Sequence, residues 1–355
     1  MNSRKVSYAT IKDVAELAET SVATVSYILS GKSEKSFRQD TVDRVMAAVE
    51  ELNYSKNAIA SGLRGNKRGI IYIIIPQFSN IYYTRVCEAI ENVLFENGLV
   101  PVICDTREDP EREKHLLELA ISQRCDGIVL GPTIRGWENT AAVRSLNIPL
   151  VVVGRELGSP NDQKSYYYSY YYVGDDSYQA GYLAGSVLAK GGHESIGVID
   201  WGSQIGSAID RSNGFTAAIK KHCPGVKLMH ASSMIVDVDT GYQLTKRIFG
   251  DKMPNALFYS YHVLAHGGIT YLHERGLRIP EDVTISMVGT PSWAKLLESP
   301  CTMVNQNEDW VGSTAAKIML RLIDGDTSSL LMSEYRHVCR CQLVEHSGFR
   351  KAASN

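Results

Sequence analysis

From residue 69 onward, short apolar runs alternate with segments of helical length that carry apolar residues on one face. This alternation predicts parallel sheets with helices on both faces. Because it runs through two series, we expect two doubly wound α/β lobes, in which 302–306 crosses back and a helix at 308–323 rejoins the first lobe. The first series has strands at 70–76, 99–105, 126–131 and 150–154 and helices at 82–97, 110–123 and near 137–145. The second has helices at 177–190, 210–222, 238–250 and 263–275 and strands at 195–200, 227–235, 256–260 and 283–289.

The segment before these lobes has a different pattern and is all helical. Residues 10–53 predict three short helices, the first opened by the capping-box sequence Thr10 to Asp13 and the second by Ser21. Two short helices joined by a three-residue turn and backed by a third form a helix-turn-helix unit. We therefore expect a helix-turn-helix domain at 1–56, a hinge helix and linker at 57–68, and a body at 69–355. Within the body, lobe 1 covers about 69–172 and 307–335, and lobe 2 about 173–302.

The charge of the chain is unevenly distributed between these parts. Residues 1–68 hold 11 Lys and Arg against 8 Asp and Glu, a net charge of +3, whereas the whole chain has a net charge of -2. A basic head on an acidic body is typical of a protein that binds a polyanion. No secretory signal is evident, and the apolar run Ile70–Ile75 is far too short to cross a membrane, so we expect a cytoplasmic protein.

Motifs for catalysis or metal binding are not evident in this sequence. Its seven cysteines form no framework, and Cys339 and Cys341, the one close pair, are expected to share a strand face and pack. The sequence lacks a P-loop, an HExxH motif, a GxSxG motif and a dinucleotide fingerprint. We therefore expect no enzyme activity, no cofactor and no metal.

Three stretches resemble one known family. These are Ala9–Ala18 with Ser21–Ser26, then Val49–Ala60 closed by Leu63, and Arg211 followed by Gly214 and Phe215. Together they resemble the LacI/GalR (lac repressor-type) family over nearly the whole chain. The resemblance implies a dimeric regulator, a repressor more often than an activator, that binds a near-palindromic operator in double-stranded DNA. It also implies a small-molecule effector in the cleft between the lobes.

Within the head, the resemblance assigns the second helix to the major groove. Val22 and Ala23 match base-reading positions, where apolar side chains can contact thymine methyl groups. Tyr27 stands where the family usually has Arg, so the operator preference should differ from the common one. Four further residues match phosphate-contacting positions of the family, namely Thr10, Ser21, Thr24 and Ser26. Ser30 is a weaker match, because the family has Asn there. The alternative is that these small side chains serve as helix caps.

The hinge has its own implied role on DNA. Leu63 matches the leucine that the family inserts into a central minor-groove step, and Asn57 and Ala60 share this segment. An apolar wedge unstacks a base step and bends the duplex. The alternative is that Leu63 is an ordinary core residue.

In the cleft, this sequence keeps some of the family's effector-contacting residues and replaces others. Arg211 matches the ligand-clamping arginine of the family, although an interlobe salt bridge is the alternative role. The family's acidic residues are replaced at Tyr261-His262 and at Pro291-Ser292, so we expect Arg211 to lack acidic neighbours and the effector to be anionic or carbohydrate-related. The full candidate set is Phe78, Asp176, Arg211, Tyr261, Trp293 and Gln306.

Two further readings remain open at this point. The body could sense a protein partner, or the chain could be a solute-binding receptor with a body of the same shape. Tyr166–Tyr172 holds six tyrosines in seven positions and could form a strand at the sheet edge, a dimer patch or a ligand contact.

Overall fold

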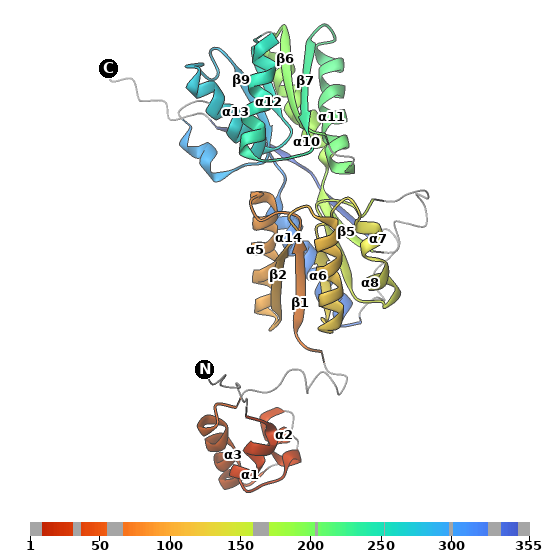
Figure 1. Ribbon diagram of the computed structural model, residues 1–355, viewed down its shortest axis with the longest axis vertical. Coiled ribbons are helices and arrows are strands. Elements are labelled where there is room, and N and C mark those ends of the chain that lie inside the picture. Colours follow the sequence, from red (N-terminus) through yellow and green to blue (C-terminus); the bar gives the residue numbers. More distant parts are fainter. Residues whose placement is uncertain are drawn as a thin grey trace, which may run out of the picture. The chain divides into compact units, whose positions relative to one another are not determined.

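The chain divides into two units, Met1–Arg68 and Gly69–Asn355, and the second contains two α/β lobes (Figure 1). In this computed structural model, no helix of the described part of the chain is long and apolar enough to span a membrane. The structure describes residues 9–30, 37–54, 67–158, 170–202, 205–251, 253–297, 301–325 and 335–346.

Local hydrogen bonds set the helix boundaries of the head. The Asp13 carboxylate accepts from the Thr10 N–H at 2.6 Å, and the Thr10 hydroxyl accepts from the Asp13 N–H, which completes the capping box. In the turn that follows, Glu19 has a φ of 50°, and the Ser21 hydroxyl accepts from the Thr24 N–H at 3.0 Å. The helices are α1 (Ile11–Leu17), α2 (Val22–Ser30) and α3 (Gln39–Glu51), packed around Val14, Val25 and Val45.

Lobe 1 is a parallel sheet covered by helices on both faces, as the alternating pattern predicts. Helices α5 and α14 pack on one face of the sheet, while α6 and α8 pack on the other. Its strands, in the order in which they lie, are β11 (Arg336–Cys339), β5 (Tyr171–Asp175), β4 (Leu150–Val153), β3 (Gly127–Leu130), β1 (Ile70–Ile75) and β2 (Val100–Asp105). Its helices are α5 (Ile81–Glu96), α6 (Pro110–Ser122), α7 (Gly136–Asn139), α8 (Ala141–Ser145) and α14 (Glu308–Ile323).

Lobe 2 repeats this architecture with one difference. Its last strand, β12, runs antiparallel to β10, whereas the other strands are parallel. The order is β12 (Gln342–His346), β10 (Cys301–Asn305), β9 (Thr284–Val288), β8 (Ala256–Tyr259), β6 (Ser195–Trp201) and β7 (Lys227–Ser233). Its helices are α10 (Ser177–Leu188), η1 (Ala189–Gly191), α11 (Gly206–His222), α12 (Val238–Asp251), α13 (His262–Glu274) and η2 (Ser292–Leu296).

The described part of the tyrosine run does not form a sheet edge. Strand β5 lies between β4 and β11, and Tyr170, Tyr171 and Tyr172 are all buried. Tyr171 packs in the core on the α5 side of the sheet, whereas Tyr170 and Tyr172 pack in the core on the α6 side. The edge-strand interpretation is therefore wrong for these three residues, and Tyr166–Ser169 lie outside the described residues.

Two glycines bring α10 and α11 into close contact, and this contact fixes the position of Arg211. A Cβ on Gly181 would overlap the backbone carbonyl of Arg211, and a Cβ on Gly214 would overlap that of Tyr178. Any larger residue at either position must push the helices apart.

We expect Gly214→Ala to destabilise the body by about 1–3 kcal/mol, because its methyl group meets backbone that cannot rotate away. Urea denaturation measures this change. The matched control is Gly206→Ala in the first turn of the same helix, where a Cβ meets nothing within 4 Å. Equal stability of the two variants would show that the helices do not need this close approach.

Candidate functional site

The head presents a mixed polar and aromatic surface along α2. Val25 is fully buried, whereas Ser21, Ala23 and Tyr27 are exposed, with 53% of Tyr27 accessible. Thr24 and Ser26 are half-buried, and Val22 is half-buried against the head core. Thr10 is exposed, and Ser30 ends the helix. The hinge residues Asn57, Ala60 and Leu63 lie outside the described residues.

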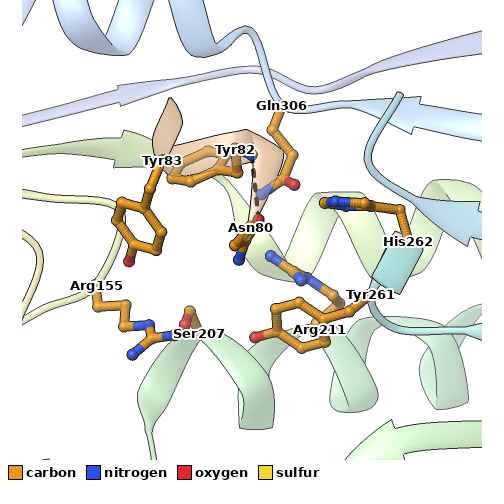
Figure 2. Close-up of a pocket in the computed structure, with 10 residues that line it drawn as sticks. Asn80, Tyr82, Tyr83, Arg155, Ser207, Arg211, Tyr261, His262 and Gln306 are labelled. Carbon is orange, nitrogen blue, oxygen red and sulfur yellow. Dashed lines mark hydrogen bonds between the residues drawn. The ribbon is translucent and has the colours of Figure 1, made fainter. Parts of the chain in front are cut away.

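A second candidate site lies between the lobes of the body (Figure 2). Parallel strands in both lobes end here, and the helices that follow them begin here, so a cleft forms at the crossovers between the lobes. The cavity has a volume of about 20 Å³, enough for one small polar group. Its lining residues are Asn80, Tyr82, Tyr83, Gly154, Arg155, Ser207, Arg211, Tyr261, His262 and Gln306.

Arg211 reaches into this cavity from α11 and is only 3% exposed. One Nη donates to the Ser260 carbonyl at 2.9 Å, and the guanidinium lies 4.4 Å from the ring centre of Tyr261. The Nε–H has no hydrogen-bond partner among the described residues. A buried charged group with one unmet donor is costly, so this atom marks a place where a ligand would be stabilised.

The expectation that Arg211 has no acidic neighbour is wrong. Burial opposes its charge, but Tyr261, Asp175 and Asp200 outweigh burial and raise the pKa of Arg211. None of these carboxylates forms an ion pair with it within the described part of the chain. Two buried carboxylates, from strands β5 and β6, therefore stabilise the charge of Arg211 without a direct ion pair.

Asp175 is the carboxylate that joins the crossovers. It ends β5, accepts from Gln306 Nε2 at 3.0 Å and from the Ser177 hydroxyl at 3.2 Å, and lies 4.0 Å from Cys341 Sγ. These groups come from three separate chain passages between the lobes. Burial raises the pKa of Asp175, and Arg211 partly offsets this rise.

The two cysteines near this point lie in different cores. Cys339 packs in lobe 1 and Cys341 in lobe 2, so they do not share one strand face as the sequence spacing predicts. The chain crosses between the lobes at Arg340, between these two residues.

Arg155 lines the cavity from lobe 1 and is held by Glu108. Two of its nitrogens donate to the two carboxylate oxygens at 2.8 and 2.7 Å. Burial opposes its charge, but Tyr83 and Glu108 outweigh it and raise the pKa of Arg155. Gly154, just before it, has a φ of +71°, and a Cβ there would lie 2.8 Å from the Tyr82 ring.

Alternating cationic and aromatic groups link the two lobes beside the cavity. The Arg155 guanidinium lies 4.7 Å from the ring centre of Trp201 in lobe 2. Trp201 in turn contacts Tyr261 edge to face at 5.6 Å, and Tyr261 lies beneath Arg211. Such contacts favour a fixed relative position of the lobes. On the other side, an Arg85 nitrogen of lobe 1 donates to the Thr290 hydroxyl of lobe 2 at 3.1 Å.

His262 is a buried, uncharged member of the cavity wall. Burial and the nearby charges of Arg211 and Arg85 lower the pKa of His262 to about 4. At neutral pH its ring is therefore neutral and can both donate and accept a hydrogen bond.

The structure brings together part of the predicted effector set. Arg211, Tyr261 and Gln306 line the cavity, and Phe78, Asp176 and Trp293 are not among the lining residues. Phe78 is 48% exposed, the Asp176 carboxylate caps α10 by accepting from Gln179 N, and Trp293 stacks on His266.

Sequence reasoning missed several cavity residues. Asn80, Tyr82 and Tyr83 follow the first strand, and Gly154-Arg155 follows the fourth. Their position just after apolar strands was the available signal, because those strand ends face the cleft.

A helix-turn-helix head joined to a two-lobed body with a polar cleft defines a DNA-binding domain fused to a ligand-binding body. The family model for bacterial regulatory proteins of the lacI family matches residues 10–57, and the model for the periplasmic binding protein domain matches 71–327. The chain belongs to the LacI family of transcriptional regulators.

Curated relatives match most of the chain. The HTH-type transcriptional repressor PurR of Haemophilus influenzae (strain PittEE) is 29% identical over 317 residues, covering 89% of this chain and 91% of the relative. The protein of that name from Pasteurella multocida is 29% identical over 320 residues, with coverage of 89% and 92%.

Solved structures agree with the fold. A LacI-family regulator from Silicibacter pomeroyi has a TM-score of 0.78 and 26% identity, covering 95% of this chain and 98% of that one. The lac repressor dimer bound to operator and the anti-inducer ONPF has a TM-score of 0.79 at 21% identity, with the same coverage.

We expect His262 to make the body sensitive to acid. Its folded pKa is about 4 and its ordinary value is 6.5, so between these values the unfolded state binds the proton and the folded state does not. Stability is therefore lost as pH falls from about 6.5 toward about 4, by on the order of 3 kcal/mol.

Urea denaturation across this pH range tests the assignment. In His262→Asn the acid-dependent loss should shrink by most of that amount, because no proton is taken up at this position on unfolding. The exposed His230→Asn is the control and should follow the parent chain. An unchanged pH slope in His262→Asn would contradict the assignment.

Proposed function

We propose that this chain is a transcriptional repressor that binds a near-palindromic operator as a homodimer and is released by a small-molecule effector in the interlobe cleft. The observation that carries the proposal is the presence, on one chain, of a LacI-family helix-turn-helix head and a cleft with buried polar groups. The curated relatives, which this chain matches over about nine-tenths of their length, are named as repressors, and this supports repression.

The homodimer rests on two arguments. One helix-turn-helix head offers a small DNA interface, so two heads are needed to distinguish an operator from other DNA. A two-fold symmetric dimer then requires a site with matching symmetry. The lac repressor structure, which is similar in fold, is a dimer on its operator.

The residues proposed to contact DNA remain those of the second helix, its caps and the hinge. Exposure of Ala23 and Tyr27 on α2 supports a role in reading bases. Leu63 is proposed as the minor-groove wedge on the basis of sequence alone. In this proposal the chain has no catalytic activity, and a body that senses a protein partner is the alternative.

Selection of DNA sequences by the full-length chain should return a near-palindrome, and sedimentation should show a dimer at micromolar concentration. The two half-sites should be related by the two-fold axis of the dimer. A monomer that keeps full specific binding would contradict the dimer. Failure to enrich any sequence would contradict the DNA-binding function itself.

The substitution Tyr27→Arg should change the selected sequence. An arginine fork on the exposed face of α2 can donate twice to guanine, which tyrosine cannot, so preference should shift toward guanine at one symmetric position by about 1–3 kcal/mol. The matched control is Tyr178→Arg, which changes a tyrosine of the body that is 46% exposed. If both variants select the parent sequence, Tyr27 faces away from the bases.

A further inference from the structure

Three helices begin at the cleft cavity, and their first residues line it. Asn80, Tyr82 and Tyr83 come from the start of α5, Ser207 from the first turn of α11, and His262 opens α13. The first N–H groups of a helix have no partner within it, and its N-terminus carries a partial positive charge. The N-terminal residues Ile205 of α11 and Tyr261 of α13 make no side-chain cap hydrogen bond.

Two buried donors in the wall of the cavity point independently to a ligand. The Nε–H of Arg211 and the hydroxyl of Tyr82 are both buried and have no hydrogen-bond partner among the described residues. Burial raises the pKa of Tyr82 well above its usual range, so this hydroxyl keeps its proton and can donate. Arg211 belongs to lobe 2 and Tyr82 to lobe 1, so each lobe contributes one of the two donors to the cavity.

The described part of the same wall carries no carboxylate. None of the ten described lining residues is acidic. The carboxylate of Glu108 is fully engaged by Arg155, and Asp175 accepts from Gln306 and Ser177. The cavity therefore offers the two unpartnered donors and the charge of Arg211 to whatever enters it.

We propose that the cleft recognises a small metabolite through an oxyanion, a carboxylate or a phosphate ester, held between Arg211 Nε and the Tyr82 hydroxyl. This proposal rests on the proposed effector function and narrows its ligand class. An oxyanion accepts from both donors and is stabilised by the helix N-termini. The cavity of about 20 Å³ has room for about one water molecule, which is the size of a single oxyanion oxygen.

Simple anions test this chemistry without knowledge of the metabolite. Acetate represents the carboxylate arm, inorganic phosphate represents the phosphate arm, and acetamide is the neutral isostere of acetate. Thermal unfolding of the full chain is followed at constant ionic strength set with sodium chloride. We expect at least one anion to raise the unfolding temperature in a saturable way, in the millimolar range, and acetamide to have no effect. Whichever of acetate and phosphate raises the unfolding temperature shows whether the oxyanion is a carboxylate or a phosphate.

Two variants assign the effect to the cavity. Tyr82→Phe keeps the buried ring and removes only the hydroxyl, and Arg211→Gln removes the charge. Each should weaken anion binding tenfold or more, while the exposed ion-pair variant Arg278→Gln should bind like the parent chain. Circular dichroism checks that Arg211→Gln is folded, and Tyr82→Phe carries the test if it is not.

The outcomes separate this inference from the function on which it rests. The inference is overturned if neither anion stabilises the chain more than chloride does, or if stabilisation survives both variants. Operator selection is measured separately, so a chain that binds DNA but no oxyanion refutes only the ligand class. A chain that binds the oxyanion but selects no DNA refutes the regulator.

Discussion

The buried carboxylate of Asp175 connects all the described passages of the chain between the lobes. It accepts from Gln306 on the passage from β10 to α14, and it lies beside Cys341 on the passage from β11 to β12. It also contributes the negative charge that helps Arg211 remain ionised in a buried position. Removing one member of such a network leaves the other polar groups buried without partners. The passages between the lobes and the ligand site therefore depend on the same few hydrogen bonds.

The fold explains why these groups meet. In parallel sheets the strands point their carboxyl ends at one edge, and the following helices start there. Each lobe therefore directs helix N-termini at the cleft, and the residues just after β1, β4, β6 and β8 become its wall. The glycine contact between α10 and α11 then sets how far Arg211 can reach. Backbone geometry thus brings the donor side chains of both lobes to one cavity.

Sequence patterns predicted the parts of this protein that depend on periodicity. The capping box at Thr10, the turn before Ser21 and the alternation of strands and helices along the chain all follow from local rules. Arg211 and Gln306 were placed by family resemblance, and Tyr261 was proposed where the sequence departs from the family. Asp175 was missed in favour of Asp176, because successive residues at a strand end point to opposite sides. The Arg155–Glu108 pair joins residues 47 positions apart, and no local pattern reveals such a contact.

The contacts across the cleft bear on how a ligand could act. The contacts of Arg155 with Trp201 and of Arg85 with Thr290 join the lobes at two points. A ligand shifts an equilibrium only through interactions that differ between its states. Because Tyr82 and Arg211 belong to different lobes, a group that bonds both of them favours the arrangement that brings these atoms together. A group that bonds only Arg211 is indifferent to lobe position. Coupling between ligand binding and DNA binding therefore depends on ligand contacts with both walls of the cleft. By thermodynamic linkage, the factor by which the ligand changes operator affinity equals the factor by which the operator changes ligand affinity.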